Sequence, residues 1–327
     1  AYIYKRIKET DPVREASHVV IDEAQDFGMM AYCCLHYCLR GCTYTIIGDT
    51  SQNIHFRYGL NDWEELRKLV LTGTYDAFGL LRKSYRNTVE ISKFANDILR
   101  HGDFAVYPVE PIIRHGAAVR VEKQPDATAL LEETVHTIRK WQQDGYETIA
   151  VICREEKEAA ELAEQLKSYM EIVDCNPGTT EFGDGVMVLS VAYTKGLEFD
   201  AVLLYDPTQK KYPADNGHVK LLYVAATRAL HELVVLYHGN LSRILTDPVS
   251  KEKKQEYARI YLDKMWNQAY SNKLIQWENI VFGNARLIFE FPQNSGSGFK
   301  FQISNNSGFS EIQYQDSTER GYFSRSY

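Results

Sequence analysis

Short apolar runs recur along the chain, and within each run the hydrophobic residues are continuous instead of alternating with polar ones. Continuous apolarity over about four to eight residues is typical of strands buried on both faces, as in a parallel sheet. The pattern therefore predicts buried strands at residues 18–21, 44–48, 148–153, 186–191, 201–205 and 233–237.

Segments with helical periodicity separate many of these runs. Residues 89–102, 126–145 and 155–170 repeat apolar positions three or four apart, and the first two end at a glycine, where helices often stop. Residues 221–233 are predicted to form an amphipathic helix. Strands that alternate with helices indicate an α/β fold with parallel sheets and crossover helices.

The pattern changes after His238. Residues 250–270 look helical, whereas residues 291–327 are rich in Gly, Ser, Asn and aromatic side chains. Weak alternation at 299–304 and 310–315 fits either a small β-hairpin or a poorly ordered tail. The sequence does not choose between these two.

The composition is that of a globular protein. With 327 residues, 44% of them hydrophobic, the chain can bury a sizeable core in two domains or one large one. The net charge of −7 comes from interspersed residues of both signs, so any contact with nucleic acid must be local. The chain has no apolar run of about 18 residues and no signal-peptide pattern at its start, which predicts a cytoplasmic protein without a membrane segment.

Cysteines gather around His36, between residues 33 and 42. One interpretation is a metal site, although the spacing fits zinc ligation poorly. A buried helix is favoured instead, because Met30, Cys34 and Cys38 lie four apart on one helical face and free cysteine behaves as a small hydrophobe.

Polar side chains follow the first two predicted strands. Asp22 and Glu23 come directly after the first strand, and Asp49 and Gln52 follow the second. In open α/β sheets, ligands bind outside the carboxyl ends of the strands, so we expect Asp22, Glu23 and Gln52 around one crevice. The first carboxylate can hold hydrated Mg²⁺ while the second acts as a general base toward water. Taken alone, an Asp-Glu pair is more often a solvated strand end.

Side chains suited to a nucleotide occur further downstream. Tyr85 and Arg86 lie just before a predicted helix, where a ring can stack on a base and a guanidinium can contact phosphate. Each such residue alone is also compatible with ordinary packing or a surface position. The order of the segments along the chain supports the functional interpretation. After Tyr85 and Arg86, the order continues with Lys195, Gly196, Glu198, Thr227 and Arg228.

This ordered series resembles the later motifs of superfamily 1 helicases of the UvrD and Rep type. The matching stretches, from Val20 to Ala229, are VIDEAQD, GDTSQNI, LRKSYRN, VLSVAYTKGLEFDAV and LLYVAATRA. Within that superfamily, QNIHFRYGLNDWEEL is similar to the HelD, or helicase IV-like, branch. The resemblance implies a RecA-like P-loop NTPase fold with parallel sheets flanked by helices. It assigns 1–78 to the C-terminal part of a first RecA-like domain, 79–240 to a complete second one and 241–327 to an extension of unknown role.

The resemblance also implies an ATP site that uses Mg²⁺. Asp22 would ligate Mg²⁺, and Glu23 would activate the attacking water. Gln25 and Gln52 would couple the γ-phosphate to the nucleic-acid path.

The remaining matched residues would contact the nucleotide from the second domain. Tyr85 would stack on the adenine, and Gly196 and Glu198 would contact the nucleotide. Arg86 and Arg228 would act as arginine fingers, which stabilise charge on the transferring phosphoryl group.

The sequence departs from the family pattern at the positions that touch a nucleic-acid strand. Where the fifth motif of the family usually has Thr and His, this chain has Ser190 and Ala192. In place of the Trp of the third motif, it offers His55, Phe56 and Tyr58, one of which could still stack on a base. Movement on a strand is therefore a weaker expectation than ATP hydrolysis.

No GxxxxGK followed by Ser or Thr occurs in the sequence. We therefore expect the chain to be the C-terminal portion of a longer protein whose upstream part completes the ATP site, and to be inactive alone. The first functional hypothesis is a DNA helicase or translocase on single-stranded DNA. The alternatives are a HelD-like ATPase that remodels RNA polymerase and a non-catalytic interaction module.

Overall fold

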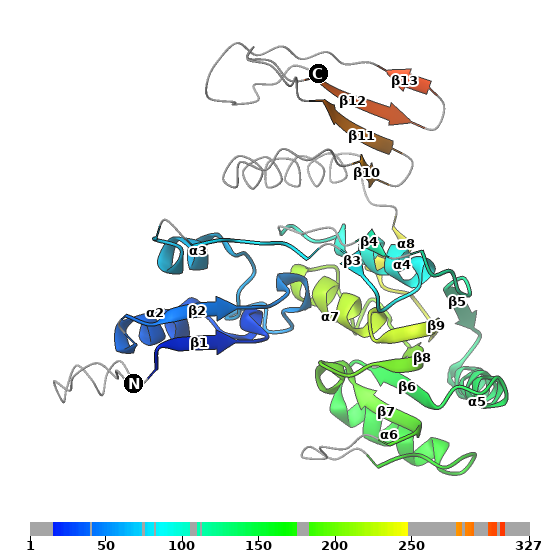
Figure 1. The fold of residues 1–327 in the computed structure, drawn as a ribbon. Coiled ribbons are helices and arrows are strands. Elements are labelled where there is room, and N and C mark those ends of the chain that lie inside the picture. Colours follow the sequence, from blue (N-terminus) through cyan, green and yellow to red (C-terminus); the bar gives the residue numbers. More distant parts are fainter. Residues whose placement is uncertain are drawn as a thin grey trace. The chain divides into compact units, whose positions relative to one another are not determined.

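The computed structural model describes most of the chain from residue 16 to residue 247, and the backbone of four strands nearer the C-terminus. Contacts divide the chain into two units, Ala1–Tyr257 and Ala258–Tyr327 (Figure 1). Every predicted site residue belongs to the first unit. Between 16 and 247, the residues that the structure does not describe are 40, 74–75, 82, 105–109, 112 and 175–182.

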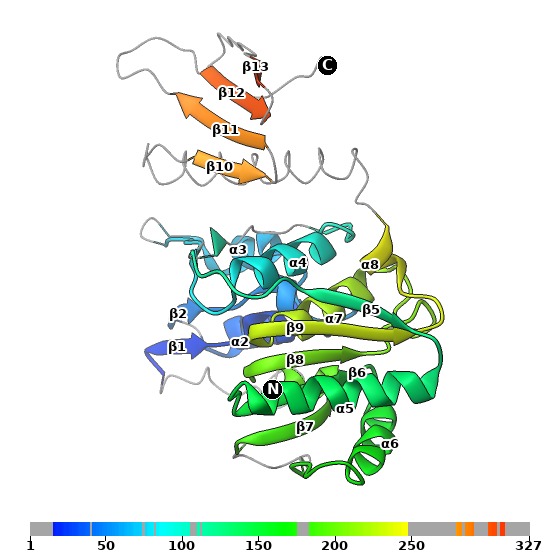
Figure 2. The ribbon, with the colours of Figure 1, turned by 90° about the vertical axis from the view of Figure 1, so that its right-hand side faces the viewer.

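A five-stranded sheet forms the larger part of the first unit (Figure 2). Its strands are β5 (Arg120–Gln124), β6 (Thr148–Cys153), β7 (Gly185–Ser190), β8 (Phe199–Tyr205) and β9 (Ala229–His238). Their order is β5-β9-β8-β6-β7, and every neighbouring pair is parallel. Parallel neighbours require crossover connections, which the helices between the strands provide.

Helices cover both faces of this sheet. They are α4 (Val89–Leu99), α5 (Ala127–Gln143), α6 (Glu156–Leu166) and α7 (Asn216–Ala226). Along β6, Ile149, Val151 and Cys153 join a core with α5 and α6, whereas Ala150 and Ile152 join a core with α4 and α7. The apolar runs are continuous because successive side chains point to opposite faces and both faces are buried.

The predicted α/β fold with parallel strands flanked by helices is confirmed. All the predicted strands up to residue 238 are present, but the apolar pattern does not reveal β5, whose sequence is RVEKQ. Within the described part of the chain, this strand lies at the edge of the sheet and has β9 as its one partner. Val121 is 40% exposed, which shows that an edge strand can tolerate charged neighbours and solvent.

A smaller parallel pair consists of β1 (His18–Ile21) and β2 (Thr43–Ile46), connected through α2 (Met29–Cys38). The register pairs His18 with Thr43 and Ile21 with Ile46, so both strands end at the same edge. A short 3-10 helix follows each strand, and α3 comes next. These elements are η1 (Ala24–Asp26), η2 (Thr50–Gln52) and α3 (Glu64–Val70).

The helix that carries the cysteines buries a different face from the predicted one. Tyr32 is 2% exposed and packs in the core beneath β1 and β2, whereas Met30 is 75% exposed. Cys34 and Cys38 are only partly buried. The prediction that these three lie on a buried face is wrong, because the neighbouring strands, and not hydrophobicity alone, decide which face of α2 is covered.

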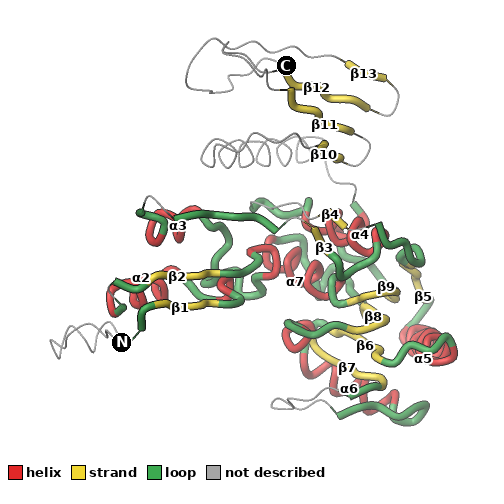
Figure 3. The backbone as a smooth tube through the Cα atoms, viewed as in Figure 1, coloured by secondary structure: helices red, strands yellow, loops and turns green. Residues whose placement is uncertain are grey.

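Helix α7 ends earlier than predicted. It stops at Ala226, Thr227 is its C-terminal cap and Arg228 directly precedes β9, so neither residue lies within the helix. The predicted amphipathic face is also wrong, since every residue from Val219 to Ala226 is buried. The reason is that α7 contacts η2 as well as α4, β8 and β9. Figure 3 shows α7 beside α4 and β9. Among the described residues, no helix is long and apolar enough to cross a bilayer.

The second unit contains an antiparallel sheet in the order β10-β11-β12-β13. Of the two alternatives for the C-terminal region, antiparallel strands are therefore present, and the alternating run at 299–304 overlaps β12. The predicted helix at 250–270 lies outside the described residues, as does most of 310–315. The strands are β10 (Asn279–Phe282), β11 (Ala285–Glu290), β12 (Lys300–Asn305) and β13 (Gly308–Ser310).

Candidate functional site

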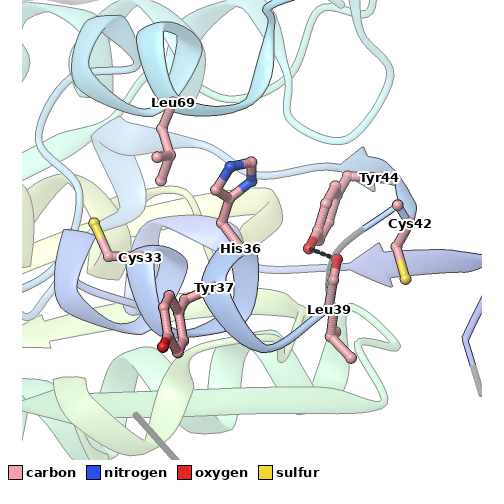
Figure 4. A pocket seen from close by; sticks show the side chains of 8 residues that line it. Cys33, His36, Tyr37, Leu39, Cys42, Tyr44 and Leu69 are labelled. Carbon is pink, nitrogen blue, oxygen red and sulfur yellow. Dashed lines mark hydrogen bonds between the residues drawn. The ribbon is translucent and has the colours of Figure 1, made fainter. Parts of the chain in front are cut away.

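An open cavity of about 470 Å³ lies beside α2, lined in part by Cys33, His36 and Tyr44 (Figure 4). The Tyr44 hydroxyl donates to the carbonyl of Leu39 at 3.4 Å. Within the described part of the chain, no group of three or more His, Cys, Asp or Glu side chains could hold a metal ion. Four of the residues predicted to form the ATP site lie elsewhere, in the segments that follow β1 and β2: Asp22, Glu23, Gln25 and Gln52.

Two exposed carboxylates lie where β1 ends. Asp22 accepts a hydrogen bond from the backbone N–H of Glu23 at 2.8 Å. Glu23 has a left-handed backbone, with φ 50° and ψ 40°. Residues other than glycine adopt this conformation rarely, and such strain is concentrated at functional sites. The turn at Glu23 leaves both carboxylates open to solvent.

Gln25 connects the ends of the two strands. Its side chain is fully buried, donates to the Glu23 carboxylate at 2.5 Å and accepts from the backbone N–H of Asp49 at 2.9 Å. Gly48 makes this possible, because a Cβ there would lie 2.4 Å from Oε1 of Gln25 and 2.9 Å from the backbone N of Ala24. Gln25 therefore fixes the Glu23 carboxylate relative to the end of β2.

Replacing Gly48 with alanine is expected to destabilise the chain by about 1 to 3 kcal/mol, the usual cost of overpacking, and to displace Gln25 from Glu23. Urea unfolding measures the stability. The matched control is Gly79→Ala, because a Cβ at Gly79 would meet nothing within 4 Å. Equal free energies of unfolding for the two variants would contradict the close contact.

A second amide, Gln52, extends these contacts to Arg228. It donates to the Asp49 carboxylate at 2.9 Å and accepts from Nη2 of Arg228 at 2.9 Å. Asp49 thus connects two pairs of side chains, Glu23 with Gln25 and Gln52 with Arg228. We term this series of hydrogen bonds the amide path. It brings together four of the predicted site residues from both ends of the sequence match.

Arg228 is 1% exposed although it carries a charge. Its Nε donates to the carbonyl of Val224 at 3.1 Å, and its Nη1 to that of Leu197 at 3.2 Å. Burial, and then the charge of Arg86, lower the pKa of the guanidinium to about 10, so it stays charged near neutral pH. Among the described residues, no carboxylate forms an ion pair with Arg228. Its guanidinium is held instead by neutral acceptors, the carbonyls of Val224 and Leu197 and the side chain of Gln52.

Lys195 forms ion pairs that the local sequence pattern does not reveal. Its ammonium contacts the carboxylate of Asp26 and, at 3.5 Å, that of Glu23. The next residue, Gly196, has a φ of 78°, which turns the chain toward β8. Lys195 and Asp26 are 169 positions apart, so only the tertiary fold identifies the lysine as a partner of the β1 carboxylates.

Arg86 and Glu198 form a partly exposed ion pair, with Nη2 and Oε1 at 2.5 Å. Their side chains are 38% and 39% exposed, and pairs this accessible contribute little to stability. Arg86 can therefore exchange Glu198 for another anion at low cost. The neighbouring Tyr85 is 74% exposed, which leaves its ring open for stacking.

Two further residues of the matched segments hold the backbone. Asn87 is buried and donates to the carbonyls of Thr227 at 3.0 Å and Ala229 at 2.6 Å, on either side of Arg228. Asp200 accepts from the backbone N–H of Thr148 at 2.9 Å and from its hydroxyl at 3.0 Å. Asp200 thereby fixes the start of β6 against β8, which is a structural role.

The residues predicted to contact nucleic acid are not equally accessible. The rings of His55 and Tyr58 stack with centroids 4.8 Å apart, and Tyr58 is 61% exposed. Phe56 is partly buried, and the ammonium of Lys220 lies 5.2 Å from its ring centroid. Ser190 ends β7 and is 4% exposed. Contacts of all four residues with a nucleic-acid strand stay predictions, and Tyr58 is the exposed ring among them.

The segment around Lys195 and Arg228 is also the part of the chain that matches a known family. Residues 185–236 match the model of the UvrD-like helicase C-terminal domain. The matched segment runs from β7 to β9 and carries Lys195, Glu198 and Arg228. This match supports a helicase-family role for the chain. A search of proteins with curated functions gave no match.

Several solved structures are similar to parts of the chain. The C-terminal domain of a possible DNA helicase from Lactobacillus plantarum WCFS1 is 27% identical, with 52% of this chain and 96% of that one covered and a TM-score of 0.42. The PRRSV helicase is 15% identical, with 67% of this chain and 34% of that one covered and a TM-score of 0.36. S. cerevisiae Dbp5 bound to RNA and ADP BeF3 is 12% identical, with coverages of 83% and 66% and a TM-score of 0.43.

Proposed function

We propose that this chain forms one side of the ATP-hydrolysing site of a UvrD-like helicase, and that hydrolysis drives movement along single-stranded DNA. The amide path carries the proposal, because it connects an exposed carboxylate at a strand end to a buried arginine in the segment that matches the helicase family. An interaction module without catalysis has no need of a strained Glu23 joined in this way to a buried charge.

Asp22 and Glu23 have separate roles in this proposal. The exposed Asp22 carboxylate fits Mg²⁺, which commonly takes one or two protein carboxylates together with waters and substrate phosphates. When bound, Mg²⁺ would neutralise charge on the phosphate oxygens. Glu23, oriented by Gln25 and Lys195, accepts the proton of the attacking water.

Arg228 and Arg86 are the groups that stabilise negative charge on the transferring phosphoryl group. The backbone carbonyls of Val224 and Leu197 already hold Arg228, so little reorganisation is needed when the charge develops. Arg86 exchanges Glu198 for a phosphate oxygen. Tyr85 supplies the ring on which the adenine stacks.

The phosphate-binding loop is not among these 327 residues, since they contain no GxxxxGK followed by Ser or Thr. The proposal therefore assigns the loop to a polypeptide segment outside this sequence. Turnover is accordingly expected from the complete protein and not from this chain alone.

The accessible stacked pair of His55 and Tyr58 is the proposed platform for a DNA base. Stacking of a base on such a ring contributes about 1 to 3 kcal/mol to binding, largely independent of which base it is. A local aromatic platform is consistent with a chain whose net charge is −7, because no broad basic surface is needed to begin the contact.

The ATP turnover of the complete protein, with and without single-stranded oligothymidylate, tests the proposal. We expect hydrolysis that requires Mg²⁺ and increases severalfold with the oligonucleotide. Absence of hydrolysis in both conditions would overturn the proposal. Stimulation by RNA polymerase but not by DNA would replace movement on DNA with HelD-like remodelling of the polymerase.

Replacing Tyr85 with alanine is expected to raise the KM for ATP about tenfold with little change in kcat, because stacking on an aromatic ring contributes about 1 to 3 kcal/mol. Steady-state kinetics of the complete protein measures both constants. Tyr85→Phe keeps the ring and should keep the KM. An unchanged KM in Tyr85→Ala would show that the adenine is bound elsewhere.

A further inference from the structure

Lys220 is a fully buried lysine that none of the roles described above uses. It lies on α7, about two helical turns before Arg228. Its side chain points to the segment that follows β2, because its Nζ donates to the carbonyl of Thr50 and to Oδ1 of Asn61, both at 2.7 Å. One cation thus holds the segment both before and after the His55–Tyr58 pair.

Residues 53–61 form the aromatic loop. Within this loop, Asn61 connects Lys220 to Phe56. Its Nδ2 donates to the carbonyl of Phe56 at 2.7 Å while its Oδ1 accepts from Lys220. The Lys220 ammonium also lies 5.2 Å from the Phe56 ring and 4.6 Å from the Phe104 ring, within the range of cation–π contacts. The position of the aromatic loop therefore depends directly on α7.

The charge of Lys220 has no counter-ion in the described part of the chain. Burial lowers the pKa of Lys220 to about 8, and the charges of Asp49 and Asp62, which raise it, offset this only in part. A methionine would fill the same space without the cost of burying a charge. What the lysine adds is therefore the directed hydrogen bonds to Thr50 and Asn61, together with attraction to the two aromatic rings.

We propose that Lys220 is a positioning residue that makes ATP turnover depend on occupancy of the aromatic loop by nucleic acid. Two contacts join α7 to the segment after β2: Lys220 holds Thr50 and Asn61, and Arg228 holds Gln52. A strand that moves the aromatic loop moves α7 through Lys220, and Arg228 moves with it. This inference rests on the proposed function. It adds the route by which DNA bound at His55 and Tyr58 changes the position of Arg228.

The stimulation ratio tests the coupling. It is the ATP turnover of the complete protein with oligothymidylate divided by the turnover without it. We expect Lys220→Met to lower this ratio about tenfold and Lys220→Arg, which keeps the charge, to restore part of it. An unchanged ratio in Lys220→Met would overturn the proposal and leave Lys220 as a packing residue.

Lys211→Met is the matched control. Lys211 is another poorly exposed lysine, paired with Asp206 and Glu158 at 2.5 Å. It follows the end of β8, whereas Arg228 precedes the start of β9. Its replacement should lower stability but leave the stimulation ratio intact. A fall in the ratio as large as that of Lys220→Met would mean that general destabilisation, and not the link through Lys220, reduces the ratio.

Amide hydrogen exchange on this chain separates failure of the link from failure of the proposed function, because it requires no hydrolysis. Lys220→Met should accelerate exchange in residues 53–61 and around Arg228, and Lys211→Met should not. If exchange responds but the complete protein hydrolyses no ATP, the proposed function is wrong while the physical link stands. If exchange in both segments is unchanged, the link itself is wrong.

Discussion

Replacing Arg228 with alanine is expected to lower the ATP turnover of the complete protein by about 10³-fold or more, the range seen when an arginine finger is removed. The side chain is almost fully buried, has no carboxylate partner among the described residues and is held by two backbone carbonyls and by Gln52. These contacts fix the guanidinium before the reaction begins. Their loss removes charge stabilisation from the transition state, so kcat should fall much more than the affinity for ATP.

Two further variants show whether the loss is specific. Arg228→Lys keeps a charge but cannot reproduce the forked contacts, so it should recover little turnover. Arg100→Ala removes an arginine of another helix end, paired with Asp97, and should leave turnover unchanged. Turnover close to normal in a folded Arg228→Ala protein would show that this arginine is not the catalytic finger.

The strands and the crossover helices could be predicted because their signal is local. The run at residues 148–153 is apolar at every position except the first, since β6 has a covered face on each side, and the structure has the strand at the same residues. The carboxylates after β1 were also visible, because parallel strands end at a common edge. Where both faces of a strand are buried, the continuous apolar run alone predicts the strand.

The contacts that complete the site could not be predicted in this way. Lys195 contacts Asp26, and Lys220 contacts Thr50. The two residues of each pair are separated by about half the sequence, so no local spacing indicates the pairing. The end of α7 is another example. The apolar pattern continues past Ala226, but the chain leaves the helix there and Asn87 binds the backbone on both sides of Arg228.

Burial also changes which of the predicted roles have support. Gln25 and Gln52, predicted to couple the γ-phosphate to the nucleic-acid path, form hydrogen bonds that join Glu23 to Arg228 through Asp49. They therefore act first as structural connections. A nucleotide that draws Glu23 or Arg228 toward itself would be sensed through these connections. The coupling proposed for the amides therefore follows from their contacts with protein and needs no direct contact with phosphate.

Replacing Glu23 with glutamine is expected to abolish ATP turnover while binding of the nucleotide persists. A positioned general base contributes about 10² to 10⁴ in rate, and glutamine cannot accept the proton from water. Its amide oxygen can still accept the hydrogen bond from Gln25, so the strained turn at φ 50° should be retained. Turnover is measured by phosphate release, and binding by the fluorescence of a labelled nucleotide.

Asp26→Asn is the matched control for this last variant. It removes one negative charge from the same ion-paired group, since both carboxylates contact Lys195, but it leaves the base in place. A loss of turnover in Glu23→Gln alone therefore assigns the effect to proton transfer, whereas an equal loss in both variants assigns it to the position of Lys195. Unimpaired hydrolysis in Glu23→Gln would remove the general base from the mechanism, because no other carboxylate at the end of β1 is both exposed and joined to Arg228 through the amide path.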